Sequence, residues 1–534
     1  MPRHRRLPAV STALATAGVL VTATAGSAAA LPAPTRISLV PIGTYATGIF
    51  DGAAAEIVAH DPQTQRLFVV NANLGLVEVL DIADPSNPTL VTTIEASGEV
   101  NSVAVRDGVV AAAVQADPVQ EPGRVELFDT DGTLLAGVTV GALPDMVTFT
   151  PDGRTILVAN EGEPAGYCPG DAGDPEGSVS VIDVSAGAAA VTQDDVRTAD
   201  FAAYNGSADE LRAAGIRIFG PGASVAQDLE PEYVAVDADS ATAWVTLQEN
   251  NALAVVDIAT ATVTDLLPLG YKDHSTVRNA FDASNEDDGV NIRPWPVNGM
   301  YMPDGMDSYQ RGGSTFLVTA NEGDARDYEC FAEEERIGDL TLDPAAFPFA
   351  ERLQADERLG RLQTTTASPT TSPATELYSF GARSFSIWDD TGQLVFDSGS
   401  AFERITAASN QAVFNATNDD NDSFDSRSDD KGPEPEGIEI GNAFGSTYAF
   451  IGLERVGGIV VYDITSPTRP RFVEYENNRH YEGDPEAGTA GDLGPEGIAF
   501  IAAGDSPVAL PLLAVANEVS GTTTLYEVRP GYGR

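Results

Sequence analysis

The sequence is poor in the residues on which most zinc sites and nucleic-acid-binding surfaces depend. Its 534 residues include two lysines, two cysteines and four histidines, and 80 Asp and Glu outnumber 30 Lys and Arg to give a net charge of -50. So large a negative excess excludes charge-driven binding to nucleic acid or to an anionic membrane. Two cysteines with so few histidines make a poor zinc site. The sequence also lacks a G-x-S-x-G elbow and a Walker loop, so neither a serine-hydrolase site nor a P-loop is indicated.

Apolar runs long enough to span a bilayer are missing after residue 30. Residues 1–30 combine a basic start, an Ala-rich apolar middle and an Ala-Ala-Ala end, which predicts a secretory signal peptide cleaved near Ala30. Because "YEVRPGYGR" at the other end carries no hydrophobic tail, we expect a secreted, extracellular protein rather than an anchored one. In that oxidising compartment Cys168 and Cys330 can form a disulfide, although the sequence leaves open whether they meet.

A recurring unit of alternating strands organises the rest of the chain. "TILVANEGEP" (155–164), "TFLVTANEGDA" (315–325) and "LLAVANEVSG" (512–521) are apolar strands that end in Asn-Glu, and each leads into another strand ending in Asp or Glu. Seven such units begin near residues 56, 101, 145, 232, 304, 436 and 496. Short strands in a repeat of this length predict an all-β fold, a seven-bladed β-propeller, with six or eight blades as alternatives. The unassigned strand "TRISLVPIGTYA" (35–46) is expected to complete the last blade and so to cover its open edge.

Three insertions interrupt the repeat without indicating a second domain. They cover residues of about 185–228, 325–378 and 401–431, so we expect one propeller domain over residues 31–534. "SADELRAAGI" (207–216) predicts a short helix that begins at a serine, and "PAAFPFAERLQADERLGRLQ" (344–363) is also expected to be helical.

An acidic residue starts most of the repeat units, frequently after proline. The innermost strand of a propeller blade starts on the face where the next strand ends, so these acids are expected around the axial mouth, with the acids that end the next strands one step outward. The first set is Glu56, Asp145, Glu232, Asp304, Glu436 and Glu496, and the second is Glu161, Glu249, Glu322, Glu454 and Glu518.

Carboxylate oxygens without thiols or many imidazoles favour calcium or magnesium. We therefore predict a divalent cation, calcium in the first place, with metal ligands drawn from Asp145, Glu232, Asp304, Glu436 and Glu496. The alternative is that repeated acids form turns and caps inherited with the unit. "NDDNDSFDSRSDD" (418–430) resembles a calcium loop in composition, but it lacks the Gly and terminal Glu of an EF-hand.

Basic residues occur in the same neighbourhoods as these acids. Arg326 lies in "NEGDARDY", and Arg427 and Lys431 lie in "SFDSRSDDKGPEPEGIEI" (423–440), where six of eighteen residues are acidic. A metal next to such cations is the arrangement that phosphoryl transfer uses, which makes these three residues candidate phosphate ligands. The alternative is that each cation pairs with neighbouring carboxylates. No catalytic residue is assigned.

Several long motifs carry a resemblance to a known family. "LPDMVTFTPDG", "VANEGEP", "QDLEPEYVAV", "LVTANEGDARDY", "SFDSRSDDKGPEPEG" and "LGPEGIAFI" together resemble the choice-of-anchor I family over nearly all of residues 36–528. This family is similar to the mesenchyme-specific cell-surface glycoproteins of sea urchin biomineralising cells, and some relatives are described as atypical, calcium-dependent alkaline phosphatases. The resemblance implies an extracellular role that uses calcium. The family name reflects varied C-terminal anchors, and from the C-terminal sequence we expect none in this protein.

Two functions stay open from the sequence. The first is a secreted calcium-binding propeller, expected to be monomeric, that binds or scaffolds extracellular matrix or mineral without turnover. The second is a calcium-dependent phosphoesterase acting on phosphate esters. A sugar- or quinone-linked dehydrogenase rests on fold analogy alone.

Overall fold

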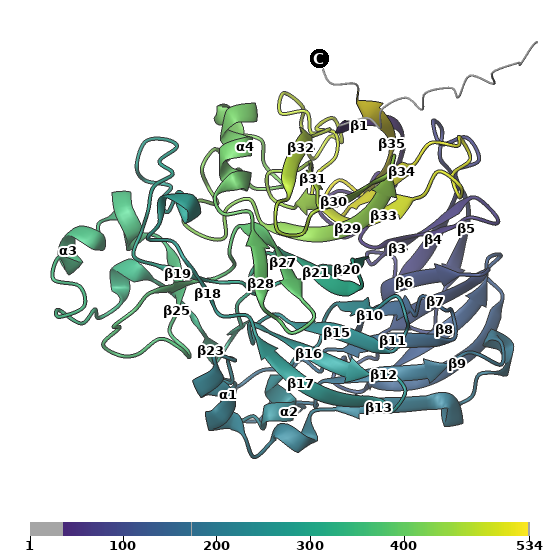
Figure 1. The fold of residues 1–534 in the computed structure, drawn as a ribbon, viewed down its shortest axis with the longest axis horizontal. Helices are drawn as coiled ribbons and strands as arrows, with labels where there is room; N and C mark the ends of the chain where they lie inside the picture. Colours follow the sequence, from purple (N-terminus) through teal and green to yellow (C-terminus); the bar gives the residue numbers. More distant parts are fainter. Residues whose placement is uncertain (1–35, 172, 532–534) are drawn as a thin grey trace, which may run out of the picture.

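Seven antiparallel sheets of four strands make up most of the molecule (Figure 1). The fold is that of a computed structural model, which describes residues 36–171 and 173–531. The predicted signal peptide lies outside the described residues. The all-β class predicted from the sequence is confirmed. In the described residues, no helix is long and apolar enough to cross a membrane.

In five of the seven sheets, the four strands follow one another directly in the chain. The first four sheets consist of β2 (Val58–Asp61), β3 (Arg66–Asn71), β4 (Leu76–Asp81) and β5 (Thr89–Glu95); β6 (Val100–Arg106), β7 (Val109–Val114), β8 (Pro122–Asp129) and β9 (Leu134–Ala142); β10 (Pro144–Phe149), β11 (Thr155–Asn160), β12 (Ser178–Asp183) and β13 (Val196–Asp200); and β14 (Val234–Val236), β15 (Thr242–Leu247), β16 (Ala252–Asp257) and β17 (Thr262–Pro268).

The last sheet combines the two ends of the chain. The remaining three sheets are β20 (Met306–Arg311), β21 (Ser314–Asn321), β27 (Ser384–Asp389) and β28 (Leu394–Asp397); β29 (Pro435–Ala443), β30 (Ser446–Leu453), β31 (Ile459–Asp463) and β32 (Arg471–Glu476); and β33 (Pro495–Ile501), β34 (Leu512–Asn517), β35 (Thr522–Gly531) and β1 (Arg36–Ala46). β1 pairs antiparallel with β35 from Arg36 opposite Gly531 to Ala46 opposite Thr522. The expected pairing of the N-terminal strand with the last sheet is confirmed.

The middle strands are buried on both faces because each sheet packs against its neighbours. β11 reads Thr-Ile-Leu-Val-Ala-Asn, and all but its first residue are buried. One hydrophobic cluster joins Ala111 and Val125 of the second sheet to Ile156 and Val158 of the third. A continuous apolar run of this kind is typical of a strand that is covered on both sides.

The first strands of the sheets form the centre of the molecule. Each contacts the first strand of the next sheet, and β2 of the first sheet also contacts β33 of the last. Sheets that pack face to face around a common centre are the architecture of a β-propeller.

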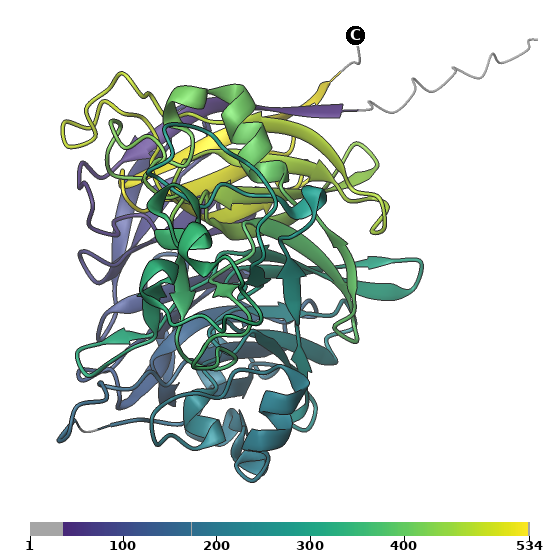
Figure 2. The ribbon, with the colours of Figure 1, turned by 90° about the vertical axis from the view of Figure 1, so that its left-hand side faces the viewer.

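The insertions build a lobe beside the sheets, at the left of Figure 1 and in front in Figure 2. Its strands are β18 (Tyr271–Asp273), β19 (Asn298–Met300), β22 (Asp327–Tyr328), β23 (Phe331–Ala332), β24 (Glu334–Arg336), β25 (Gln363–Thr365) and β26 (Tyr378–Ser379). A separate core of Phe281, Trp295, Ile337, Leu359 and Leu377 holds it together.

The predicted insertions differ from the structure in three respects. Residues 269–305 contribute to the lobe although the sequence did not mark them as an insertion, and 185–228 includes β13, which belongs to the third sheet. The helix predicted in 207–216 is confirmed as α1 (Ala208–Ala214), and α2 (Val225–Asp228) follows it. The helix predicted over 344–363 is confirmed only in part: α3 (Ala350–Leu353) is one turn, and a second helical segment, Asp356–Gly360, is interrupted at Arg358.

Two further features connect the insertions to the sheets. Cys168, in the loop after β11, and Cys330, in the lobe, form a disulfide across 162 residues of sequence. α4 (Ala401–Ser409) starts the third insertion, and residues 410–434 then run from the lobe to the start of β29. We call this segment the acidic loop.

Candidate divalent-cation site

A cavity of about 460 Å³ lies at the centre of the ring formed by the first strands. Every one of the seven sheets contributes a carboxylate to its lining. These carboxylates belong to Glu56, Glu99, Asp145, Glu161, Glu232, Asp304, Glu322, Asp324, Glu436 and Glu496. All five predicted metal ligands therefore line one cavity, which we call the axial cavity.

Bulges at the starts of two first strands direct an acid toward the axis. The pairing of β29 with β30 shifts register between Pro435 and Ile438, and the pairing of β33 with β34 shifts between Pro495 and Ile498. Such a bulge leaves the residues between the paired positions out of the ladder and re-aims their side chains. Glu436 and Glu496 occupy these positions.

Glycines directly after three of the acids allow the first strands of neighbouring sheets to pack closely against one another. A Cβ atom added to Gly305, Gly437 or Gly497 would collide with the backbone carbonyl oxygen of the acid in the next sheet. The acids so approached are Glu436, Glu496 and Glu56 respectively. Any larger residue would push the first strands apart, so the Pro-acid-Gly pattern in the sequence has a packing cause.

Asp304, Glu322 and Glu436 form the tightest group of acids in the axial cavity. Each offers a carboxylate oxygen, and these oxygens all lie within 4.8 Å of one another. In addition, Oε2 atoms of Glu232, Glu436 and Glu496 are buried without a hydrogen-bond partner. A buried carboxylate oxygen without a partner destabilises the folded state, so we expect a proton or a cation to be bound to these oxygens.

The electrostatics of the axial cavity oppose full ionisation. Burial raises the pKa of Glu56 to about 8, with Glu518 and Asp145 adding to the effect, and burial raises the pKa of Asp145 to about 6. The pKa values of Glu232, Asp304 and Glu436 lie well above their usual range, through burial first and neighbouring carboxylates second. At neutral pH the cavity holds either bound protons or a cation that replaces them.

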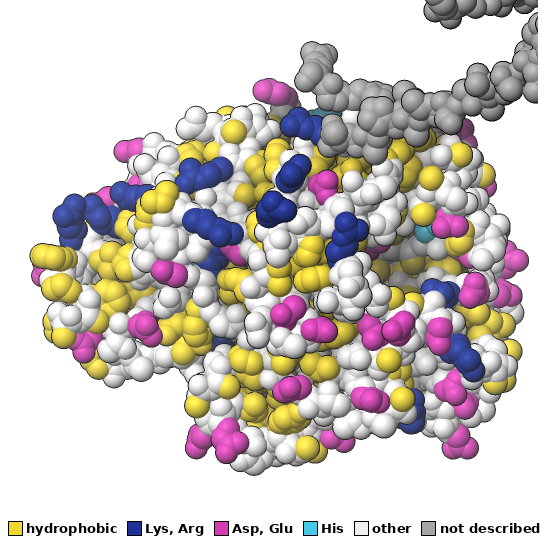
Figure 3. Space-filling model, in the orientation of Figure 1, with side chains coloured by type: hydrophobic (Ala, Val, Ile, Leu, Met, Phe, Trp, Pro, Cys, Tyr) yellow, Lys and Arg dark blue, Asp and Glu magenta, His cyan; other side chains and the backbone are white. Residues whose placement is uncertain are grey.

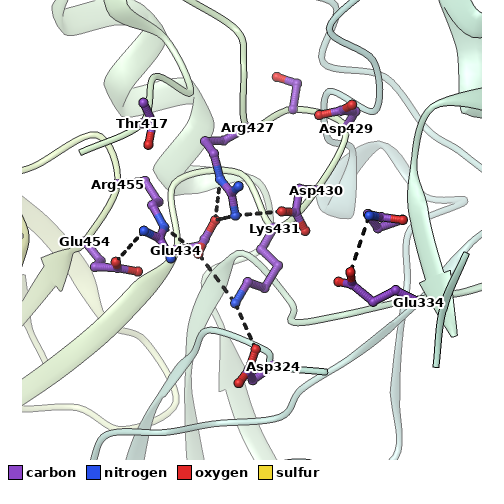
Figure 4. A network of polar contacts seen from close by, with 12 residues as sticks. Asp324, Glu334, Thr417, Arg427, Asp429, Asp430, Lys431, Glu434, Glu454 and Arg455 are labelled. Atoms are coloured by element: carbon purple, nitrogen blue, oxygen red, sulfur yellow. Dashed lines mark hydrogen bonds and ion pairs between the residues drawn. The ribbon is translucent and has the colours of Figure 1, made fainter. Parts of the chain in front are cut away.

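Three cations surround one buried carboxylate next to this cavity (Figure 4). Glu434 is fully buried. Its Oε1 lies 2.6 Å from Arg427 Nη2, and its Oε2 lies 2.9 Å from Arg455 Nε and 3.5 Å from Lys431 Nζ. Burial alone would raise the pKa of Glu434, but the three cations lower it to about 2. Glu434 is therefore ionised where the neighbouring acids resist ionisation.

Lys431 joins this cation cluster to the axial cavity. Its Nζ lies 3.2 Å from Glu322 Oε1 and 3.5 Å from Asp324 Oδ1, and both of these acids line the cavity. Burial opposes its charge, yet these acids and Glu434 raise the pKa of Lys431 well above its usual value. Lys431 thus supplies a fixed positive charge at one edge of the cavity.

Arg326 does not join the other two candidate phosphate ligands. Its guanidinium is buried against Asp228 and Glu230, with Nη2 2.8 Å from Glu230 Oε2, and it lies over the ring of Phe219 at 4.5 Å. Because both carboxylates occupy it and it is 3% exposed, it cannot reach a phosphate. For Arg326 the alternative of pairing with neighbouring acids is correct.

The sequence also missed some members of the site. Glu434 belongs to the first of two adjacent Pro-Glu pairs, and the pattern singled out the second pair. Glu99 precedes the weakest repeat unit, in which Asn101 takes the place of the acid, and both residues line the axial cavity. Glu99 could have been predicted from the sequence "GEVNSV" (98–103), in which it lies two positions before Asn101.

A second cavity of about 360 Å³ adjoins the axial cavity. The two cavities share five lining residues, which form the neck between them: Ile57, Ser102, Met146, Tyr233 and Ile498. The second is lined mainly by apolar residues, with Glu439 as an acid whose Oε1 accepts a hydrogen bond from the backbone N–H of Phe500. The concentration of carboxylates is thus confined to one side of the neck.

Surface acids are arranged differently from those in the axial cavity. On the face drawn in Figure 3, Asp and Glu side chains are spread singly or in pairs among Lys, Arg and uncharged residues. Such acids are solvated and carry little information about a site. The net charge of -50 is therefore partly an ordinary acidic surface and partly the cavity.

Similarities to solved structures are low in sequence identity. The chain aligns over 92% of its length with all of a hydrazine synthase chain from Kuenenia stuttgartiensis, at 13% identity and a TM-score of 0.46. It aligns with a streptogramin B lyase at 9% identity and a TM-score of 0.45. The β-propeller domain of Cps50 (Swd1) from Myceliophteria thermophila gives 9% identity and a TM-score of 0.43.

Sequence relatives are closer. Gigasin-3a of Magallana gigas is 32% identical over 190 residues, which cover 33% of this chain and 67% of that protein. A mesenchyme-specific cell surface glycoprotein of Strongylocentrotus purpuratus is 26% identical over 273 residues, or 44% of this chain. The matched part spans 35% of that glycoprotein's length. The model of the choice-of-anchor I domain matches residues 56–467, from the first acid of the axial cavity to the sixth sheet, and the chain belongs to the choice-of-anchor I family.

Proposed function

We propose that this protein is an extracellular or cell-surface β-propeller that binds calcium in the axial cavity. The observation that carries the proposal is the convergence of ten carboxylates from all seven sheets on one cavity, with buried oxygens that have no partner. A bound divalent cation would supply the positive charge that these oxygens lack.

Calcium fits the ligands better than the other common cations. The lining offers carboxylates and the amides of Asn101, Gln115 and Gln248, with no thiol or imidazole. Calcium accepts six to eight oxygens in flexible geometry, whereas magnesium requires a near-ideal octahedron and retains water. We propose Asp304, Glu322 and Glu436 as the core of the site, with Asp145, Glu232 and Glu496 lining the same cavity around it.

Three observations support the extracellular location. The relatives include a protein named as a cell surface glycoprotein. The sequence of residues 1–30 has the pattern of a signal peptide. The disulfide between Cys168 and Cys330 is of the kind that persists in an oxidising compartment.

We also infer that the seven four-stranded sheets are seven blades of one closed ring. The cyclic order of contacts between the first strands supports this count. So does the pairing of β1 with β35, which gives the last sheet its fourth strand.

Calcium titration of a Glu436→Gln variant tests the proposal. The substitution keeps the shape of the side chain but removes a charged ligand, so calcium should bind at least about 10-fold more weakly, as measured by isothermal titration calorimetry, which corresponds to about 1.4 kcal/mol. Without calcium, the variant should be no less stable than the wild type, because a buried charge without a partner has been removed.

Glu439→Gln is the matched control. Glu439 lies on the same strand but lines the second cavity, and glutamine retains the oxygen that accepts the hydrogen bond from Phe500. Its calcium affinity should equal that of the wild type. Unchanged affinity in a folded Glu436→Gln variant, or an equal loss in both variants, would contradict the axial site.

A phosphoesterase is the second candidate function, and the position of Lys431 favours it. An ammonium group 3.2 Å from a cavity carboxylate could hold a phosphate oxygen next to a bound cation. Against it, Arg427, Lys431 and Arg455 all have Glu434 as a partner already. Hydrolysis of 4-nitrophenyl phosphate at alkaline pH, with calcium and with chelator, decides between the two. Calcium-dependent turnover that Arg427→Ala abolishes without unfolding would establish the enzyme.

A further inference from the structure

A second group of acidic side chains, joined by one asparagine, lies between the lobe and the acidic loop, away from the axial cavity. It consists of Asp282 and Asp287 from the lobe, Glu403 of α4, and Asn415 and Asp425 of the acidic loop. We call these five residues the lobe cluster. None of them lines the axial cavity.

Hydrogen bonds connect most of the lobe cluster into a single network. Glu403 Oε2 accepts from the backbone N–H of Asp282 at 2.9 Å, and Glu403 Oε1 accepts from Asn415 Nδ2 at 3.4 Å. Asn415 Nδ2 also donates to Ser428 Oγ at 2.8 Å, and Ser428 donates to Asp425 Oδ1 at 2.5 Å. The network therefore spans three segments that are far apart in the sequence.

Several oxygens in this network have no partner although they are buried. Asp282 and Asn415 are both 0% exposed, and Asp282 Oδ1 and Asn415 Oδ1 lack a hydrogen bond. Asp287, a member of the cluster outside the network, also has a buried oxygen, Oδ1, without a partner. Asn415 indicates what kind of group would bind here. Both N–H donors of its side-chain amide are used within the cluster, whereas its carbonyl oxygen, which can only accept a hydrogen bond or bind a cation, has no partner.

Positive charge near the lobe cluster is too small to balance its acids. Arg383 Nη1 lies 2.6 Å from Glu403 Oε1, and its other contacts are backbone carbonyl oxygens, including that of Asp282. Arg336 and Arg361 both pair with Asp429 instead. Lys272 pairs with Asp397. Asp282, Asp287 and Asp425 are therefore left without a counter-charge in the described residues.

The ionisation of the lobe cluster responds to this imbalance. Burial raises the pKa of Asp282 to about 8, with Glu403, Asp425 and Asp287 adding to the effect. Burial likewise raises the pKa of Asp425 to about 7, and Asp287 and Glu403 contribute. His274, which lies against Phe281, is held neutral by burial, with Lys272 and Arg383 lowering its pKa further, so it adds no positive charge.

We propose that the lobe cluster is a second calcium site, independent of the axial cavity. Two carboxylate oxygens and one amide oxygen of the cluster have no partner, and both kinds of oxygen are ligands that calcium takes in proteins. A calcium ion there would bind the acidic loop to residues 281–291 of the lobe. Because the same loop carries Arg427, Lys431 and Glu434, this ion would also fix the cation cluster beside the axial cavity.

Hydrogen exchange of the wild-type protein tests the proposal without any substitution. Calcium should slow exchange of backbone amides in residues 281–291 and 412–430, including the N–H of Arg427 that donates to Asn415 and the N–H of Asp425 that donates to Phe414. Exchange in both segments that is the same with calcium and with chelator would overturn the site, and would mean that its acids share protons instead.

Two variants separate the lobe cluster from the axial cavity. Asp282→Asn should lower the number of calcium ions bound per chain by one and abolish the slowing of exchange in residues 412–430. Glu436→Gln should leave that slowing intact, because it alters only the axial cavity. Should Asp282→Asn not fold, Asp287→Asn serves the same purpose, since Asp287 Oδ1 is the other carboxylate oxygen of the cluster without a partner.

The outcomes distinguish failure of this site from failure of the axial one. A wild-type protein whose exchange slows with calcium only in the lobe and the acidic loop, and whose affinity is unchanged by Glu436→Gln, would support the lobe cluster and contradict the axial site. Calcium stoichiometry that is identical in the wild type, Asp282→Asn and Asp287→Asn would contradict the lobe cluster alone.

Discussion

Replacing Glu434 with Gln is expected to lower the free energy of unfolding by about 3 kcal/mol at pH 7. The substitution leaves Lys431 and the half-buried Arg427 and Arg455 without the carboxylate that all three contact. Removing one partner of a buried ion pair costs about 3–5 kcal/mol when the remaining charge is uncompensated. The lower end of that range applies here, because each cation keeps another acid as a partner: Asp430, Glu322 or Glu454. A pKa held at about 2 instead of 4.5 gives a similar figure, about 3 kcal/mol at 1.36 kcal/mol per unit.

The pH dependence of this loss has a definite sign. A carboxylate whose pKa is lowered by folding stabilises the folded state above the pKa of the unfolded chain. For Glu434 that stabilisation is complete above about pH 4.5 and is lost as the pH falls toward about 2. Urea denaturation should therefore show a large difference between wild type and variant at pH 7, and a much smaller one near pH 2.5.

Glu454→Gln is the matched control for the Glu434 variant. Glu454 is also buried and pairs with Arg455 at 2.9 Å, but burial and the nearby Glu434 hold its pKa well above the usual range. Glutamine can still accept the hydrogen bond that Asn418 donates to Glu454. This variant should lose little stability at pH 7. Equal losses in the two variants would mean that the three cations do not depend on Glu434.

Glu434 and Glu436 mark the limit of what the sequence could predict about the site. The two residues lie two positions apart, both after proline, yet one has a pKa of about 2 and the other a pKa well above the usual range. The repeat predicted that Glu436 would face the axis, since the start of a first strand is fixed by local pattern. It could not predict the environment of Glu434, because one of its three cations, Arg455, comes from the loop after β30.

Arg326 shows the same limit for a single ion pair. Its motif, "NEGDARDY", predicted a position near the axial mouth, and the repeat does place Glu322 there. The insertion that follows carries Arg326 away to Asp228 and Glu230, which are about 100 residues earlier in the chain. A repeat predicts where strands begin and end. An insertion has no repeating pattern, so the sequence does not predict which distant residues its side chains will contact. The sequence predicted the insertion of residues 325–378, but for this reason it missed the contribution of residues 269–305 to the lobe.

Calcium is expected to have its largest effect on stability at alkaline pH. In chelator, the melting temperature should fall as the pH rises from about 5 to about 8. Folding raises the pKa of Asp145 to about 6, of Glu249 to about 7 and of Glu56 to about 8, through burial in each case. In this range the folded protein binds more protons than the unfolded chain, so the free energy of unfolding falls as the pH increases.

Calcium should reverse this trend because it replaces the protons as the source of positive charge. A ligand at 1,000 times its Kd, with no affinity for the unfolded chain, adds about 4 kcal/mol to the free energy of unfolding. Thermal unfolding at pH 5, 6.5 and 8 should show a small effect of calcium at pH 5 and the largest at pH 8. Because protons must leave before the cation binds, calcium added to unbuffered protein near pH 7 should also release protons.

The control for this prediction is potassium chloride at the same ionic strength. A protein with a net charge of -50 gains some stability from any salt, which screens repulsion among its surface acids. Only a bound divalent cation would act at concentrations too low to screen and release protons as it binds. A melting temperature that is flat from pH 5 to 8 in chelator would mean that the carboxylates of the axial cavity are solvated and ionised. Equal stabilisation by calcium and by potassium chloride would mean that the cavity holds no specific ion.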